Sequence, residues 1–213
     1  MTIRRDLDVL AGEGSARRVR GGAVAVGPLE FAERAQTHTR EKGVIAEKLL
    51  ALVPRSGAIG LDASSTLQRL AHRLDDARDL TVVTNGPDTF AVLQQHAGVT
   101  ALLTGGELDR RTGSLVGPLA TRAARDLVVS TLFVSAAGLD AEFGSSESTL
   151  EDAEVKLALA DSAVDVVLAL DSSKLQTHAP ARTFALERLA AIVTELDPAN
   201  ARLDEYRSRC RIV

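Results

Sequence analysis

The chain has 213 residues, of which 45% are hydrophobic and 25% charged, a balance that is typical of globular proteins. The formal net charge of −4 excludes a surface adapted to nucleic acid as a whole, so any DNA contact must be local. A single cysteine, Cys210, excludes an internal disulfide, and no apolar run is long enough to span a membrane. We therefore expect a soluble, cytoplasmic protein in which Cys210 is buried.

The N-terminal segment, residues 1–26, combines a short helix with a basic stretch. Apolar residues recur at Ile3, Leu7 and Leu10, which is one face of a helix. The stretch SARRVRGGAV then joins arginines, a Gly-Gly turn and flanking valines, a pattern that predicts a two-stranded ribbon. Residues 27–39 carry no strong period and are interpreted as a linker.

Strands and helices alternate along the rest of the chain. Apolar periodicity predicts a first helix over residues 40–53. It then predicts strands at 58–62, 81–85, 99–106, 131–140, 164–171, 189–195 and 210–213, with helices at 65–74, 87–96, 148–163 and 197–208. Such alternation is typical of βαβ units, so we expect a doubly wound α/β domain with a mostly parallel sheet over residues 40–213.

Several expected strands end in polar residues. Ligands of open parallel sheets bind beyond the carboxyl ends of the strands, so these positions are the candidate ligand contacts. The segment LDASSTL places three hydroxyls at a helix start, where free N–H groups favour an anion; the alternative is that Ser64 or Ser65 only caps the helix. The candidate residues are Asp62, Ser64, Ser65, Thr66, Asn85, Gly105, Gly106, Asp140 and Lys174.

Together these residues suit a phosphorylated polyol. Lys174 can bind a phosphate, and the carboxylates of Asp62 and Asp140 can accept hydrogen bonds from hydroxyl groups. Glu154 and Lys156 stand two apart on an expected helix and cannot both face the same rim equally. Each of the two is therefore either a ligand contact or an ordinary exposed charge.

Metal and cofactor sites are not expected. The four histidines, His38, His72, His96 and His178, show no metal-ligand spacing. The sequence also lacks a dinucleotide-binding glycine pattern after a strand and a phosphate loop that ends in Gly-Lys-Ser/Thr.

In order, the segments TIRRDLDVLAGEG, RRVRGGAV, LDASSTL, LLTGGEL, FVSAAGLD, EDAEVK and DSSK resemble the DeoR family of bacterial transcriptional regulators. That family pairs an N-terminal winged helix-turn-helix with a domain similar in fold to ribose-5-phosphate isomerase, which binds phosphorylated sugars. The resemblance implies a recognition helix in TIRRDL, a wing in RRVRGG, and an effector site formed by the candidate residues above. The implied DNA contacts are Thr2, Arg4, Arg5, Arg17, Arg18 and Arg20.

Two features depart from the family pattern. The phosphate loop usually reads Asp-Ser-Gly-Thr-Thr, whereas Ser64 replaces the glycine here and narrows the allowed backbone angles. A winged helix-turn-helix has two helices ahead of its recognition helix, whereas only Met1 and Thr2 precede Ile3. We therefore expect a partial DNA-binding head over residues 1–26 that is loosely packed and binds DNA weakly.

The leading hypothesis is a homo-oligomeric DNA-binding repressor of sugar metabolism that senses a sugar phosphate and is not an enzyme. The alternative is a sugar-phosphate isomerase or deaminase on the same fold, with Asp140 or Glu154 as general base and Lys174 holding the substrate. A third hypothesis is an oligomerisation module whose site has degraded. The basic N-terminal stretch favours the regulator, because an enzyme has no need of it.

Overall fold

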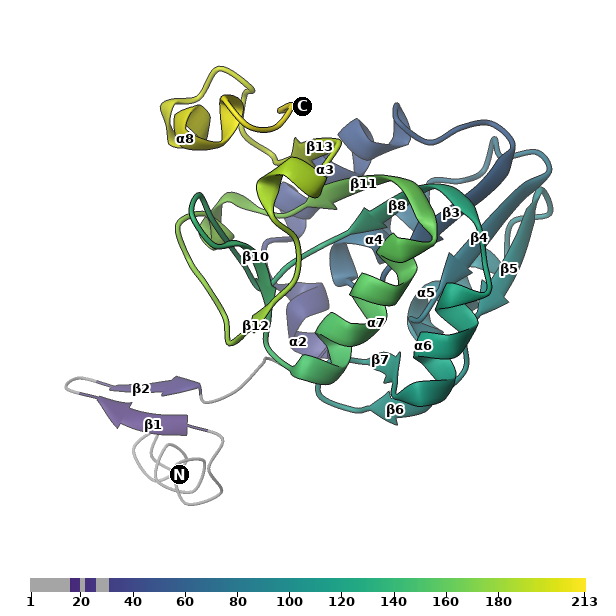
Figure 1. The fold of residues 1–213 in the computed structure, drawn as a ribbon, viewed down its shortest axis with the longest axis horizontal. Helices are drawn as coiled ribbons and strands as arrows, with labels where there is room; N and C mark the ends of the chain where they lie inside the picture. The colour runs from purple at the N-terminus through teal and green to yellow at the C-terminus, as the bar shows by residue number, and fades with distance from the viewer. Residues whose placement is uncertain (1–15, 20–21, 26–30) are drawn as a thin grey trace.

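The computed structural model describes residues 16–19, 22–25 and 31–213. Within the N-terminal segment, β1 (Ala16–Val19) and β2 (Gly22–Ala25) pair antiparallel, in a register that runs from Ala16 opposite Ala25 to Val19 opposite Gly22 (Figure 1). This hairpin confirms the expected ribbon and places Arg17 and Arg18 on β1. The expected recognition helix, with Thr2, Arg4 and Arg5, lies outside the described residues, as does Arg20.

A six-stranded, fully parallel sheet forms the centre of the molecule, as the alternating pattern predicted. Its strand order is β13-β11-β8-β3-β4-β5. The strands are β3 (Gly57–Leu61), β4 (Leu80–Thr84), β5 (Val99–Leu103), β8 (Val129–Val134), β11 (Ala163–Ala169) and β13 (Ala191–Val193). The order reverses direction between β3 and β8, which is where open α/β sheets bind ligands.

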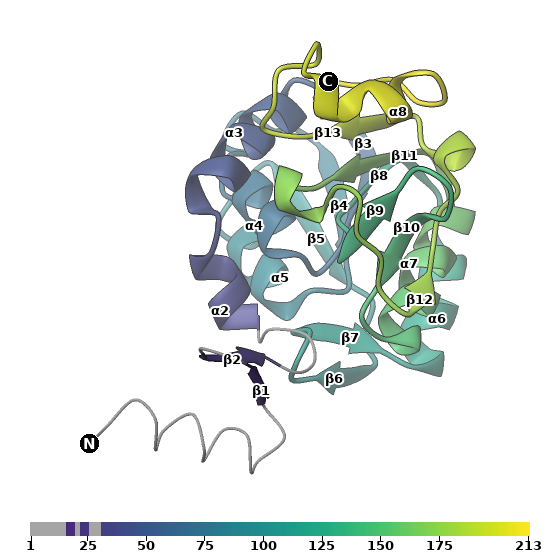
Figure 2. The same cartoon turned by 90° about the vertical axis from the view of Figure 1, so that its left-hand side faces the viewer.

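Helices cover both faces of this sheet, so the fold is doubly wound (Figure 2). Alternate residues of one strand serve opposite cores: Leu132 and Val134 pack toward one helical layer, and Phe133 toward the other. One layer holds α3 (Thr39–Leu50), α4 (Ser65–Ala71) and α5 (Pro87–Leu93), and the other holds α6 (Pro118–Arg125) and α7 (Leu150–Asp161).

Small antiparallel elements stand beside the main sheet. They are β6 (Glu107–Asp109) paired with β7 (Ser114–Val116), and β9 (Gly138–Asp140), β10 (Gly144–Glu147) and β12 (Ala181–Arg182) in the order β12-β10-β9. The single strand expected over residues 131–140 is therefore divided into β8 and β9. The division falls at Ser135, whose N–H donates to the carboxylate of Asp62 at 2.8 Å instead of to a neighbouring strand.

The segment expected as a linker contains a helix, α2 (Phe31–Gln36). Phe31 packs on Gly113, where an added Cβ would lie only 2.7 Å from the Phe31 Cβ. The guanidinium of Arg34 donates to the carbonyl of Thr112. The apolar pattern of the sequence does not indicate this helix, because none of the residues of α2 is fully buried.

The C-terminal region is less regular than the sequence predicted. The expected helix over residues 197–208 is divided into the 3-10 turn η3 (Ala201–Leu203) and α8 (Asp204–Arg207), and the expected last strand makes only one bridge, from Ile212 to Ile192. Two further 3-10 turns are η1 (Ser172–Lys174) and η2 (Leu186–Arg188). Cys210 is buried, as expected. Within the described residues, no helix is both long enough and apolar enough to cross a membrane.

Candidate effector-binding site

A cavity of about 280 Å³ opens where β3, β8 and β11 end. The loops after these strands form its floor, and the junction between α2 and α3 forms one wall. Its volume lies near the lower end of the range for small-molecule sites, about 300–1,000 Å³. The residues that line it are Arg34, Thr37, His38, Lys42, Ser64, Ser65, Thr66, Thr112, Ser135, Ala136, Ala137, Glu147, Ser148, Lys156, Asp171, Ser173 and Lys174.

Three cationic side chains, those of Arg34, Lys42 and Lys174, face this cavity. Among the described residues, none of the three has a carboxylate within ion-pair distance. The ammonium of Lys174 donates to the carbonyl of Ala136 at 2.7 Å, and burial lowers the pKa of Lys174. Cations without anionic partners in a partly enclosed site attract an anionic ligand.

Lys42 is the most enclosed of these cations, with 3% of its surface exposed. It stands on the buried face of α3, three residues before Ile45 and seven before Leu49. Its ammonium donates to the carbonyls of Arg34 and Thr37, at 2.9 Å from the latter. Burial, followed by the charge of Lys174, lowers the pKa of Lys42 to about 8.

The hydroxyl-bearing turn after β3 also reaches the cavity. Ser64 is the N-cap of α4 and accepts a hydrogen bond from the Leu67 N–H at 3.2 Å, and it also lines the cavity, so capping and a ligand contact both remain open to this side chain. Ser65 and Thr66 occupy the first helical positions, whose N–H groups have no carbonyl partner within the helix. The Ser65 hydroxyl donates to the carbonyl of Arg34 at 3.3 Å.

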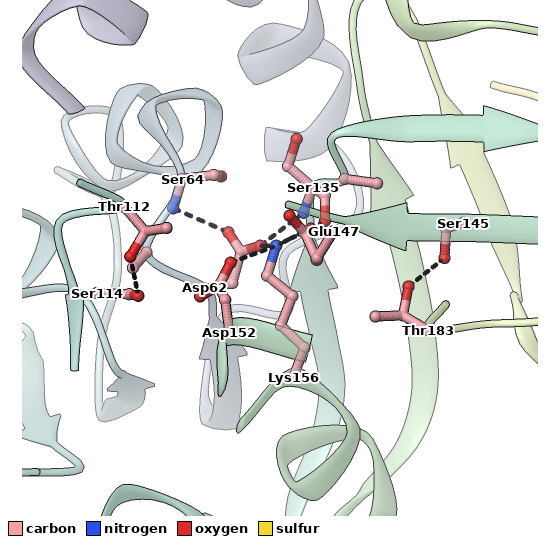
Figure 3. Close-up of polar contacts among 12 residues, drawn as sticks. Asp62, Ser64, Thr112, Ser114, Ser135, Ser145, Glu147, Asp152, Lys156 and Thr183 are labelled. Carbon is pink, nitrogen blue, oxygen red and sulfur yellow. Dashed lines mark hydrogen bonds and ion pairs between the residues drawn. The ribbon is translucent and has the colours of Figure 1, made fainter. Parts of the chain in front are cut away.

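A buried charge cluster supports the cavity floor (Figure 3). The ammonium of Lys156 lies 2.8 Å from Oδ2 of Asp62 and 3.8 Å from Oδ2 of Asp152, and it also contacts Glu147. Burial opposes the charge on Lys156, but the three carboxylates outweigh burial and raise its pKa. Burial raises the pKa of Glu147 to about 7; Lys156 opposes this rise, and the neighbouring carboxylates of Asp152 and Asp62 add to it.

Asp62 is fully buried and does not line the cavity. Its Oδ1 accepts the N–H of Ser64 at 3.0 Å, and its Oδ2 accepts the N–H of Ser135 at 2.8 Å. The side chain therefore joins the loops after β3 and β8. It positions residues of the cavity rather than contacting a ligand in it.

Four other candidate residues also lie away from the cavity. The side-chain amide of Asn85 accepts from the Ala63 N–H at 3.0 Å and donates to the Leu115 carbonyl at 3.3 Å. It is therefore hydrogen-bonded to the backbone of two other segments. Asp140 accepts the N–H groups of Glu142 and Phe143 at 2.8 and 2.9 Å. Gly105 and Gly106 form a turn with φ of 71° and 117°.

The pair on α7 is divided in the way its spacing implied. Lys156 is buried and lines the cavity, whereas Glu154 is exposed and does not. The structure thus brings together five of the candidate residues: Ser64, Ser65, Thr66, Lys156 and Lys174.

Several lining residues have no counterpart among the sequence candidates. Arg34, Thr37 and His38 fall in the stretch interpreted as a linker, and Glu147 lies on β10, which no pattern predicted. One available signal was Lys42, because a charged residue in register with Ile45 and Leu49 stands on the buried face of its helix.

The fold is a doubly wound α/β domain with a cavity where its strand order reverses, and the sequence comparisons assign the class of protein. The model of the DeoR C-terminal sensor domain matches residues 37–196, and that of the DeoR-like helix-turn-helix domain matches residues 1–28. The chain belongs to the DeoR family and is a transcriptional regulator. This decides against the isomerase or deaminase alternative.

Curated relatives agree with that assignment. An HTH-type transcriptional regulator of Bacillus subtilis (strain 168) is 33% identical over 94% of this chain and 80% of its own length. The transcriptional repressor AccR of Agrobacterium fabrum is 32% identical over 91% and 77%. The glycerol-3-phosphate regulon repressor of Escherichia coli (strain K12) is 26% identical over 92% and 79%.

A solved chain of eIF2B shares the fold at low sequence identity. A chain of the tetrameric eIF2B-beta2-delta2 complex from C. thermophilum matches with a TM-score of 0.52 and 13% identity, over 78% of this chain and 58% of that one. A D-ribose-5-phosphate isomerase matches with a TM-score of 0.47 and 13% identity, over 64% and 54%. The chain thus spans little more than half of these solved chains.

Proposed function

We propose that this regulator is a DNA-binding repressor of sugar metabolism and that its cavity binds a phosphorylated sugar, which releases it from DNA. The observation that carries the proposal is the convergence of Arg34, Lys42 and Lys174 on one small cavity without carboxylate partners among the described residues. A phosphate group supplies the missing negative charge and accepts several charge-assisted hydrogen bonds.

The same lining also suits the sugar. Glu147, Asp171 and Ser135 line the cavity, and their oxygens can accept hydrogen bonds from sugar hydroxyls. The Asp171 carboxylate itself accepts from the N–H of Ser173 at 3.2 Å. A ligand with one anionic end and several hydroxyls therefore matches both the cations and these acceptors, and a bare sugar matches only the acceptors.

DNA binding is assigned to the segment that the helix-turn-helix model matches, residues 1–28. In this proposal residues 1–26 form the DNA-binding head, with Thr2, Arg4, Arg5, Arg17, Arg18 and Arg20 as contacts, and residues 40–213 form the sensor domain. We further propose a homo-oligomer, because paired heads read two half-sites of one operator. Effector binding then shifts the arrangement of the heads.

Calorimetry with matched pairs of sugars tests the effector. Glucose 6-phosphate, fructose 6-phosphate, ribose 5-phosphate and glycerol 3-phosphate are titrated beside their unphosphorylated forms. We expect binding of at least one ester and of no parent sugar. Lys174→Met should weaken that binding about tenfold or more, because it removes a charge-assisted contact. The matched variant Lys48→Met should not, because Lys48 donates to the carbonyls of Leu196 and Val213 and does not line the cavity.

A mobility-shift experiment tests the link to DNA. DNA that the protein selects from a random pool is bound at low salt, and the ester identified by calorimetry is then added. Release of the DNA supports the proposal. A protein that binds neither DNA nor any ester would instead favour the oligomerisation module.

A further inference from the structure

The helix α2 lies between the helix-turn-helix match, which ends at residue 28, and the sensor sheet. It lies beside α4 (Figure 2). It ends at the cavity, where Arg34, Thr37 and His38 form one wall. Any shift of α2 therefore changes the shape of the cavity. The same shift moves the chain that leads to the DNA-binding segment.

Apart from the half-buried Phe31 on Gly113, polar contacts hold α2 in place, since none of its residues is fully buried. The carbonyl of Arg34 accepts from the Lys42 ammonium and the Ser65 hydroxyl, and the carbonyl of Ala35 accepts from the Arg69 guanidinium at 3.1 Å. These donors come from α3 and α4 and meet the negative end of the α2 dipole. A short helix docked in this way opens at low free-energy cost.

The cations that hold α2 also repel one another. After burial, the charges of Lys174, Arg69 and Arg34 lower the pKa of Lys42, and the carboxylate of Asp171 opposes them. Nε of Arg34 is buried and has no hydrogen-bond partner among the described residues. The docked position of α2 thus brings positive charges together and leaves a donor unsatisfied. A bound anion would relieve both penalties.

His38, a residue with an unusual backbone conformation, lies between α2 and α3. His38 has φ of 50° and ψ of 40°, a left-handed conformation that a non-glycine residue rarely adopts. It also precedes α3 without making a side-chain cap. A rotation at this single residue would change the angle of α2 while α3 stays packed on the sheet.

We propose that an anionic effector clamps α2 onto the sensor domain, so that α2 carries the effector signal toward the DNA-binding segment. The inference rests on the proposed function, because it needs an anion in the cavity. Arg34 would hold the anion from α2, and Lys174 and the first turn of α4 would hold it from the sensor body. The ligand then bridges both sides, and its binding free energy adds to the docking of α2.

Hydrogen–deuterium exchange of the ligand-free protein tests the anchoring first. Arg69 does not line the cavity, so Arg69→Met loosens α2 without removing a ligand contact. We expect exchange of the amides of residues 31–36 to become about fivefold faster or more, with β8 unchanged. The matched variant Arg73→Met removes only an ion pair to Glu47 and should leave α2 at the wild-type rate. Equal rates in all three proteins would overturn the anchoring.

Addition of inorganic phosphate or glucose 6-phosphate tests the clamp. Either anion should slow exchange over residues 31–38, and Arg69→Met should weaken its binding about fivefold by thermodynamic linkage. Binding with unchanged or faster exchange of α2 overturns the clamp and leaves the proposed function standing. If neither these two anions nor any ester of the calorimetric panel binds the wild-type protein, the proposed function and the clamp fail together.

Discussion

The ammonium of Lys156 lies 2.8 Å from Oδ2 of Asp62, and both side chains are buried. The same carboxylate accepts the N–H groups of Ser64 and Ser135, so this ion pair ties α7 to the loops after β3 and β8. The pair therefore sets the geometry of the cavity floor. Asp62 thus positions residues that line the cavity.

Replacing Lys156 tests this role. Lys156→Met would leave Asp62, Glu147 and Asp152 buried without their shared cation, and we expect a loss of about 3–5 kcal/mol of unfolding free energy. Urea denaturation at pH 7 measures it. Lys48→Met, a half-buried lysine on α3, serves as the control and should cost clearly less. A loss below about 1 kcal/mol for Lys156→Met would show that the cluster contributes little.

The pH dependence of effector binding should report Lys42. Its pKa of about 8 means that the free protein loses this charge as the pH rises through 8, and an anion binds the protonated form. We therefore expect full affinity at pH 7 and about a tenfold loss by pH 9.5, where a phosphate ester keeps its dianionic charge.

Lys42→Arg separates Lys42 from the other groups around the anion. The lowered pKa of Asp171 keeps its carboxylate ionised, and Lys174, whose pKa burial lowers, loses its proton in the same direction as Lys42. The arginine variant should flatten the profile of affinity against pH, as measured by calorimetry. An unchanged slope would assign the pH dependence to Lys174 instead.

The glycine pair after β5 provides a matched comparison. A Cβ on Gly106 would lie 2.6 Å from the carbonyl oxygen of Val116, whereas one on Gly105 meets nothing within 4 Å. Gly106→Ala should cost about 3 kcal/mol from overlap and backbone strain together, and Gly105→Ala about 1–2 kcal/mol from strain alone. Thermal denaturation distinguishes them. Equal losses would mean that packing at Gly106 relaxes freely.

Tyr206 links the C-terminal region to the cavity side of the sheet. Its hydroxyl donates to the carbonyl of Leu139 and accepts from the Gln176 N–H, both at 3.1 Å. Tyr206→Phe leaves both backbone groups without this partner, so we expect a loss of about 1–3 kcal/mol in urea denaturation. Ser130→Ala, which removes an exposed hydrogen bond to Ala58, should cost less than about 0.5 kcal/mol.

Much of the fold could be predicted because its elements carry strong local patterns. The strands β3, β8 and β11 each end in an apolar, buried run, as expected of parallel strands covered on both faces. The helices α3, α4 and α7 lie at the predicted positions. The elements that escaped prediction, such as α2 and β10, are short and have no distinct period.

The candidate site was predictable only in part. Strand ends nominated Ser64, Ser65, Thr66 and Lys174, because the edge at which parallel strands end is a property of topology. The same reasoning also nominated Asn85 and Asp140, whose side chains are instead used by neighbouring backbone groups. A polar side chain at a strand end can contact a ligand or hydrogen-bond to the backbone around it, and its polarity alone does not tell which.

By itself the sequence predicted the parallel α/β domain, the family and the edge of the sheet at which the cavity lies. These follow from periodicity and motif order, which are local along the chain. Only the tertiary structure decided which polar side chains face the cavity, because that depends on partners far apart in sequence. In the structure the Asp62 carboxylate pairs with Lys156 and accepts the N–H of Ser135. Arg34, Lys42 and Lys174, by contrast, line the same cavity.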